Sequence, residues 1–182
     1  MKKILIPALI LMVVLCACAA KNIPVEPTEP VDTNITNEPV VESKKTYKAT
    51  LYFASEDAMY LIPEEREIKY EEESALPLTI INLLKDGPNS ANLYPVLNKD
   101  SGFKSVTVDN GVAIVSLDEN FISLNSGGVT KEFMALYSVV NSLCEFENID
   151  SVRFADHNGN IIEEFGGYII DLPLTKDTTL AD

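Results

Sequence analysis

The sequence predicts an α+β domain in which two helices cover one face of a mixed β-sheet. Three observations support this prediction. Apolar residues recur twice at helical spacing, an Asn-Gly pair joins two segments of alternating polarity, and β-branched and aromatic residues fill the other apolar runs. The predicted order is strand, strand, helix, strand, strand, helix, strand, and helices packed on a sheet are a standard way to bury such elements.

Residues 1–45 are predicted to lie outside this domain. Two lysines precede an uninterrupted apolar run from Ile4 to Leu15, which is typical of an export signal and too short to span a membrane. The run ends in the letters LCAC, which resemble a bacterial lipobox in which Cys18 is lipidated. We expect residues 1–17 to be a signal peptide and a diacylglyceryl group on Cys18 to anchor the protein in the cell membrane, at its extracytoplasmic face. A plain secretory signal and an uncleaved anchor are the alternatives.

Residues 18–45 are expected to form a lipid-anchored spacer. Four prolines are spread among Glu, Thr and Asn residues without helical or strand periodicity, a composition typical of an extended, semi-rigid linker. Residues 46–182 are left for one folded domain. After cleavage, Cys144 is the only cysteine besides the acylated one, so we expect no disulfide within this domain.

The domain is predicted to begin with a β-hairpin. Residues 47–54 are rich in aromatic and β-branched side chains, residues 55–58 have the composition of a turn, and a second strand is expected from Met59 through Tyr70. Pro63 lies in this second strand, and charged residues follow it. Because proline donates no hydrogen bond to a neighbouring strand, this pattern predicts a solvent-exposed edge strand.

A helix is expected after the hairpin. Ser74 is predicted to cap this helix, which tolerates Pro77 in its first turn and ends near Lys85. The Asp-Gly-Pro sequence at 86–88 terminates it, because glycine after a helix and proline beyond it both prevent continuation. Residues 89–102 are predicted to be a loop held in place by its apolar side chains.

The second half of the domain contains the clearest local signal. Residues 103–108 and 112–117 alternate around Asn110-Gly111, the pair that favours a type I′ turn and therefore a hairpin. A strand is expected at 151–155. Around it we expect a helical turn at 118–121, a flexible loop at 123–128, a turn at 157–160 and an irregular tail from Phe165.

An amphipathic helix is predicted between these strands, from about Thr130 to Phe146. Its apolar residues recur every three or four positions, which places them on one face toward the sheet. They are Phe133, Leu136, Tyr137, Val140, Leu143 and Cys144. Polar residues lie elsewhere on the helix, namely Lys131, Glu132, Ser138, Asn141 and Glu145.

The charge of the chain excludes one class of partner. It contains 14 Lys and Arg against 28 Asp and Glu, a formal net charge of −14. Nucleic acid would be repelled by such a chain, so no nucleic-acid partner is expected. A basic protein partner is compatible with this charge.

The residues that carry chemistry do not form an enzyme site in this sequence. His157 is the single histidine and lies in a predicted turn, and Cys144 lies on the apolar face of a helix, where a buried, inert thiol is expected. We therefore expect no catalytic residue and no cofactor. Asp156, Asn158 and Asn160 alternate as oxygen ligands do in a calcium loop, but the spacing of an EF-hand is absent and a hairpin turn is the competing interpretation. We assign no metal site.

Five segments together resemble the GerMN domain of sporulation and spore germination lipoproteins. They occur in the expected order and cover about residues 50–177. The segments are LYFASEDAMYLIPEEREI, LLKDGPN, LYPVLNKDSGFKSVTVDNGVAIVSLDENF, ALYSVVNSLCEFENIDSVRF and FGGYIIDLPLTKD. The resemblance implies a fold like the ring-building motifs of secretion and sporulation channels, no established catalytic activity, and a role in assembling or localising an envelope complex.

Two functions remain open at this point. The first is a non-catalytic scaffold or assembly factor in an envelope complex, possessing an envelope protein partner or associating with itself. The alternative is a module that binds cell-wall material or a small ligand through apolar and aromatic residues. Those residues are Leu93, Tyr94 and Val96, with Tyr52 and Tyr60 in the first hairpin.

An exposed interaction surface is predicted in two places. One is the charged run of the second strand, formed by Glu64, Glu65, Arg66 and Glu67. The other is the loop from Asn125 to Lys131. An acidic edge discourages unplanned strand pairing and still admits a basic partner.

Overall fold

The computed structural model describes residues 44–179. The predicted signal peptide, the lipidation residue Cys18 and nearly all of the predicted spacer lie outside the described residues, so these predictions stay untested. Among residues 44–179, no helix has both the length and the apolar character that crossing a bilayer requires.

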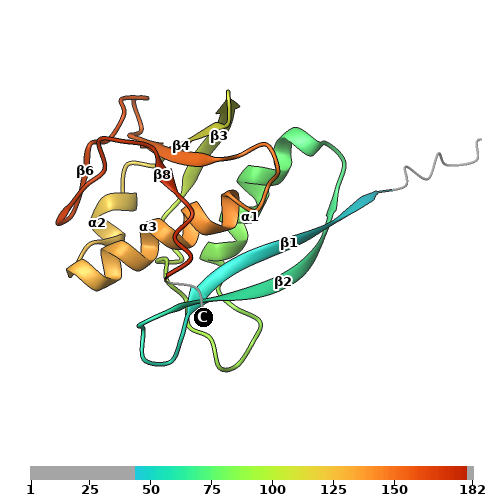
Figure 1. The fold of residues 1–182 in the computed structure, drawn as a ribbon, viewed down its shortest axis with the longest axis horizontal. Coiled ribbons are helices and arrows are strands. Elements are labelled where there is room, and N and C mark those ends of the chain that lie inside the picture. Colours follow the sequence, from blue (N-terminus) through green and yellow to red (C-terminus); the bar gives the residue numbers. More distant parts are fainter. Residues whose placement is uncertain (1–43, 180–182) are drawn as a thin grey trace, which may run out of the picture. The chain divides into compact units, whose positions relative to one another are not determined.

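The predicted α+β class is confirmed, and so is the predicted order of elements as far as the strand at 151–155 (Figure 1). The helical elements are the 3₁₀ turn η1 (Glu73–Ala75), α1 (Leu76–Lys85), α2 (Phe121–Asn125) and α3 (Val129–Leu143). The strands are β1 (Lys45–Ala54), β2 (Leu61–Tyr70), β3 (Phe103–Asp109), β4 (Val112–Leu117), β5 (Ser151–Ala155), β6 (Glu164–Phe165), β7 (Tyr168–Ile169) and β8 (Leu174–Thr175).

The strands form a mixed four-stranded sheet and two separate pairs. The sheet has the order β3-β4-β5-β8, in which β4 and β5 are parallel and the other neighbours antiparallel. The hairpin β1–β2 is a sheet of its own and packs on α1 and α3. In Figure 1, α3 runs between this hairpin and strand β4. The hairpin is therefore not part of the mixed sheet.

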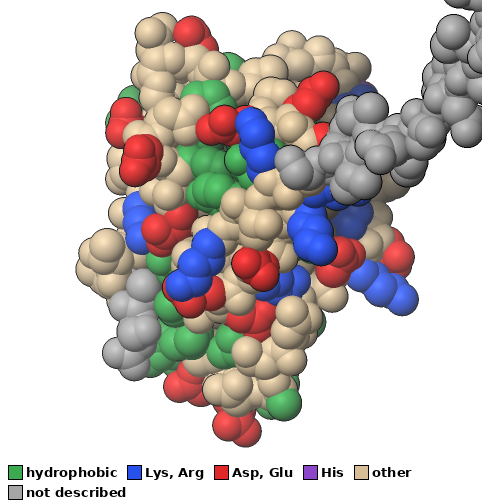
Figure 2. All heavy atoms as spheres, turned by 90° about the vertical axis from the view of Figure 1, so that its right-hand side faces the viewer, with side chains coloured by type: hydrophobic (Ala, Val, Ile, Leu, Met, Phe, Trp, Pro, Cys, Tyr) green, Lys and Arg blue, Asp and Glu red, His purple; other side chains and the backbone are tan. Residues whose placement is uncertain are grey.

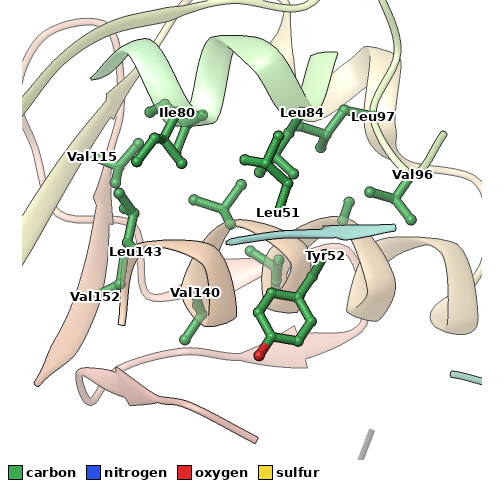
Figure 3. Packing of buried hydrophobic residues seen from close by; sticks show 14 of the residues in the cluster. Leu51, Tyr52, Ile80, Leu84, Val96, Leu97, Val115, Val140, Leu143 and Val152 are labelled. Atoms are coloured by element: carbon green, nitrogen blue, oxygen red, sulfur yellow. The ribbon is translucent and has the colours of Figure 1, made fainter. Parts of the chain in front are cut away.

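Helix α3 is buried on almost every side because elements pack against it from several directions. Its contacts are with β1 and α1 and also with β5 and β8. Figure 3 shows side chains of α3, α1, β1 and the sheet meeting in one core, among them Leu51, Ile80, Val115 and Val140. The predicted amphipathic helix is present, and its polar positions Ser138 and Asn141 are buried as well, because the β1–β2 hairpin and the segment after β8 cover them.

The polar residues of α3 hold two extended segments against the helix. Ser142 Oγ accepts a hydrogen bond from the Tyr52 N–H at 3.1 Å, and Ser138 Oγ donates to the Tyr52 carbonyl at 2.6 Å. Asn141 pairs with both backbone groups of Asp177, at 3.1 and 3.0 Å. Burying these side chains is inexpensive because each finds backbone partners that would otherwise be unsatisfied.

Among the local predictions, the hairpin turn is confirmed, while the helix cap and the irregular tail were wrong. Asn110 and Gly111 adopt positive φ angles of 48° and 81°, as a type I′ turn requires, so the predicted hairpin is confirmed. Ser74 does not cap α1: it lies within η1, and the N-cap is Ala75, which makes no side-chain capping bond. The expected irregular tail instead contains β6, β7 and β8.

Candidate functional site

A groove lies along the loop that joins α1 to β3. Its volume is about 700 Å³, and it is broadly open to solvent. Two short stretches form its walls, residues 85–91 and residues 97–100, and Leu93 and Pro95 also line it. Polar and charged residues of both stretches line the groove together with the apolar Leu93, Pro95 and Leu97, a composition able to bind a small polar ligand.

Buried charges from strand β2 hold the first wall. Glu64 accepts hydrogen bonds from the backbone N–H groups of Asn89 and Ser90, at 3.0 and 2.8 Å. Arg66 donates to the same carboxylate at 2.7 Å and to the carbonyl of Gly87 at 2.6 Å. The Arg66 guanidinium also lies 5.2 Å from the centre of the Phe53 ring, a cation–π contact.

These contacts determine the ionisation of Glu64. Burial alone would raise the pKa of this carboxyl, but hydrogen bonds from Ser90, Asn89 and Arg66 outweigh burial and lower the pKa to about 2. Glu64 is therefore a carboxylate at neutral pH although only 8% of the residue is exposed. The Glu64 carboxylate oxygens accept hydrogen bonds from the loop backbone and from Arg66.

An amide from helix α2 holds the second wall. Asn125 is fully buried; its side-chain oxygen accepts from the Asn98 N–H at 2.8 Å, and its side-chain nitrogen donates to the Phe121 carbonyl at 2.8 Å. Between the two walls, Tyr94 pairs with Ala54 through two backbone hydrogen bonds of 2.9 and 3.0 Å. Three distant elements therefore fix the loop.

The predicted interaction surface is only partly exposed. Alternation along β2 turns Glu64 and Arg66 inward, while Glu65 and Glu67 face solvent. In the other predicted region, Asn125 is buried and the expected loop begins as helix α2. The expectation of exposure was wrong for Glu64 and Asn125, because both satisfy buried backbone groups.

The exposed residues of the predicted interaction surface lie among other charged side chains. Lys131 donates to the carbonyls of Leu124 and Ser126, at 3.3 and 3.1 Å, and Glu65 pairs with Lys48 at 2.7 Å. Figure 2 shows acidic and basic side chains interspersed over one face of the molecule. Whether these residues contact a partner stays a prediction.

The aromatic cluster proposed as a ligand site is largely core. Tyr52, Leu93 and Val96 are buried, whereas Tyr60 and Tyr94 are 40% and 46% exposed. Figure 3 shows Tyr52 and Val96 among the packed apolar side chains. Of this cluster, Leu93 lines the groove. The other lining residues lie at 85–91, 95 and 97–100, and the sequence pattern did not single them out as a site.

A second polar cluster joins β1, the end of α3 and the segment after β8. Tyr52 Oη and Lys176 Nζ both donate to Glu145 Oε1, each at 2.5 Å. Burial and the bond to Glu145 raise the pKa of the Tyr52 hydroxyl. Burial also raises the pKa of the neighbouring Cys144 thiol, which keeps it protonated and poorly nucleophilic.

A third cluster is organised by Glu132, which was predicted to lie off the apolar face of its helix. Its carboxylate accepts from the N–H groups of Gly127 and Gly167, both at 3.1 Å. These bonds lower its pKa. A Cβ at Gly166 would collide with the same carboxylate, so this glycine is required for the close approach. Glu132 thus fixes the β6–β7 turn against α3.

The Asp156 segment forms a turn. The carboxylate of Asp156 accepts from the backbone of Asn158 and from the backbone and side chain of Asn160, at 2.8 to 3.0 Å. An antiparallel bridge joins Ala155 to Ile161, and His157 is exposed within the turn. The hydrogen bonds favour the hairpin-turn interpretation over a calcium loop.

Solved structures with this fold come from sporulation and lipoprotein chains. The tandem GerMN domains of the Bacillus subtilis sporulation protein GerM match with a TM-score of 0.58 and 20% identity, over 71% of this chain and 46% of that one. The chain thus spans about half of the tandem protein. The first GerMN domain alone gives 0.55 and 20%, over 71% and 97% of the two chains. A candidate lipoprotein from Clostridium perfringens gives 0.52 and 24%, over 73% and 89%.

The sequence itself also identifies a family. No curated protein sequence matches the chain. The model of the Germane family, described as sporulation and spore germination, matches residues 50–162, which is more than half of the 182 residues. The matched region contains most of the first hairpin, both long helices and the sheet strands β3 to β5. The protein therefore belongs to the Germane family, and its fold is that of a GerMN domain.

Proposed function

We propose that this protein is a non-catalytic, lipid-anchored domain that acts as a scaffold or assembly factor in an envelope protein complex of sporulation or germination. The family match over residues 50–162 carries this proposal. The lipobox ending at Cys18 and the similarity to a candidate lipoprotein support an anchor at the extracytoplasmic face of the membrane.

The use of polar side chains supports a non-catalytic role. Glu64, Asn125, Glu132 and Asn141 are buried, and each hydrogen-bonds to a backbone group of another segment. An enzyme instead requires polar groups that converge on a space where a reacting atom can be placed. These four side chains instead hold segments of the domain against one another.

Crosslinking in the native cells tests the assembly role. A photoreactive amino acid at the exposed position Glu67 is expected to capture a defined envelope protein or a second copy, during growth or starvation. The same probe at the exposed position Lys104 is the positional control. Failure of the full chain to capture either species from any exposed position would contradict the scaffold role.

A pair of cysteine variants tests the anchor. Cys18→Ser is expected to abolish lipid attachment and remove the mature protein from the membrane fraction, because Cys18 occupies the acylated position of the lipobox. Cys16→Ser, two residues earlier, is the matched control and is expected to leave the distribution unchanged. Equal behaviour of the two variants would contradict a lipid anchor at Cys18.

The groove favours a second candidate function, which is binding of cell-wall material or a small ligand. The groove has a volume of about 700 Å³, and Glu64 and Asn125 hold the backbone on its two sides, which supports this candidate. Titration of the protein with soluble wall fragments, followed through amide chemical shifts, is expected to move signals of residues 85–100. Unmoved signals throughout the domain would contradict this function.

A further inference from the structure

We propose that the groove along residues 85–100 is a binding site for a short peptide that carries both a free amine and a free carboxylate. This inference rests on the second candidate function above and names its ligand class. It is independent of the scaffold role.

The charges that line the groove define this ligand chemistry. Lys85 and Asp86 lie on one wall, and Lys99 and Asp100 lie on the other. Among the described residues, none of these four side chains takes part in an ion pair within 4.0 Å. Each wall therefore offers one cation and one anion to a ligand, and a zwitterionic chain complements this arrangement.

Neutral groups in the groove suit the backbone of a peptide. Asn89 and Asn98 line the groove on either wall; the Asn98 side-chain oxygen accepts the Asp100 N–H at 2.9 Å, and its amide N–H groups remain as donors to a peptide carbonyl. Leu93 and Leu97 also line the groove and are buried, which gives it an apolar base. A strongly anionic polymer is disfavoured, because Asp86 and Asp100 and the net charge of −14 would repel it.

Glu64, Arg66 and Asn125, which we call the braces, hold the backbone of the groove in a defined shape. A buried ion pair such as Glu64–Arg66 contributes less to stability than a well-packed apolar pair would, because both charges lose their hydration. Its other hydrogen bonds are made to backbone groups of residues 87–90, and Asn125 holds Asn98 on the opposite side. A groove held in one shape loses little conformational entropy on binding, which is the advantage of preorganisation.

Calorimetric titration of the full lipidated protein in detergent tests the proposal. The probe is the pentapeptide L-Ala-D-isoGlu-L-Lys-D-Ala-D-Ala, which has free amines and a free terminal carboxylate. We expect saturable binding that weakens about three- to fivefold in Lys85→Gln and in Lys99→Gln, the loss typical of one solvent-exposed ion pair. Lys45→Gln, an equal charge change at an exposed position on β1, is the matched control and is expected to leave the dissociation constant unchanged.

A steric variant and two altered peptides complete the test. Ala91→Trp fills the groove from an exposed position and is expected to abolish binding without changing the melting temperature. Amidating the terminal carboxylate or acetylating the lysine amine is expected to weaken binding of the normal protein. Absence of binding at 5 mM peptide, or binding that survives both Ala91→Trp and the lysine substitutions, would overturn the proposal.

The stereochemistry of the peptide distinguishes its source. Preference for the D-Ala-D-Ala form over the all-L form supports a wall peptide, and equal affinity supports an ordinary protein segment; either result supports the site itself. The outcome is separable from the scaffold role. If the peptide does not bind while crosslinking captures an envelope protein, only the groove proposal fails.

Discussion

The hairpin β3–β4 and the loop 86–102 are neighbours in the chain, but different interactions hold their backbones in place. In the hairpin, Asn110 and Gly111 supply the two positive φ angles, so the turn is specified by the residues that form it. In the loop, Glu64, Arg66 and Asn125 hold the backbone from elements more than twenty residues away. Local conformation thus specifies the first region and long-range burial of polar groups the second.

The largest effect that tests this comparison is expected from Glu64→Ala. The substitution leaves the buried Arg66 charge without its partner and two backbone N–H groups of the loop without acceptors. We expect the free energy of unfolding to fall by about 3–5 kcal/mol, measured by urea denaturation.

Glu65→Ala is the matched control for that experiment. Glu65 is the next residue, but its side chain is 62% exposed and pairs only with the equally exposed Lys48. Its loss is expected to cost less than about 1 kcal/mol. Similar costs for the two substitutions would show that the buried pair does not hold the loop.

The second expected effect is a pH dependence of the free energy of unfolding. The pKa of Glu64 falls from 4.5 in its unperturbed state to about 2 in the fold, a difference worth about 3 kcal/mol. Because the folded pKa is the lower one, this stabilisation is present above pH 4.5 and is lost as the pH falls toward 2. Denaturation of the normal protein and of Glu64→Gln at pH 7 and pH 3 measures it. An equal loss of stability in both proteins would contradict this account.

The same contrast explains which parts of the fold the sequence could predict. The two hairpins and both long helices were predictable because turn residues and apolar spacing act within a few positions of the chain. The burial of the polar face of α3 was not, since Ser138 and Asn141 are covered by segments near positions 52 and 177. No pattern within the helix reveals what will later pack against it.

The groove was predictable only in its outline. A loop after α1 followed from the Asp-Gly-Pro sequence, and its apolar anchors Leu93 and Val96 were recognised. The braces were not predictable, because the sequence indicated that Glu64 and Arg66 belong to an exposed, charged edge strand and that Asn125 belongs to a loop. One signal was available: Glu64 and Arg66 are two residues apart in a strand and therefore share a face with the apolar Ile68.

The third effect concerns the other wall of the groove. Asn125→Ala removes the acceptor of the Asn98 N–H and leaves a small cavity at a fully buried position. We expect a loss of about 2 kcal/mol in urea denaturation, the cost of one unsatisfied buried donor together with the cavity. Asn120→Ala, an exposed position just before the same helix, is expected to change stability by less than about 0.5 kcal/mol. A smaller loss at Asn125 than at Asn120 would refute the role of the buried amide.

The smallest effect is expected in the hairpin, where Gly111 supplies one of the two positive φ angles of the turn. Gly111→Ala forces a side chain into a positive φ of 81° and places its Cβ against the Asp150 carboxylate. Asp150 is exposed and its side chain can rotate away, so we expect a cost of about 1–2 kcal/mol, mostly from the backbone. Gly159→Ala is the matched control, since its φ is 89° and no atom lies within 4 Å of the added Cβ.

Combining Gly111→Ala with Glu64→Ala tests whether the two regions are independent. If the turn is specified locally and the loop by distant braces, the two losses in unfolding free energy should add to within about 0.5 kcal/mol, as they do for separate sites. A coupling larger than about 1 kcal/mol would mean that the hairpin and the loop are held as one unit. The braces would then stabilise the sheet as well as the groove, and the distinction between local and long-range control would fail for this fold.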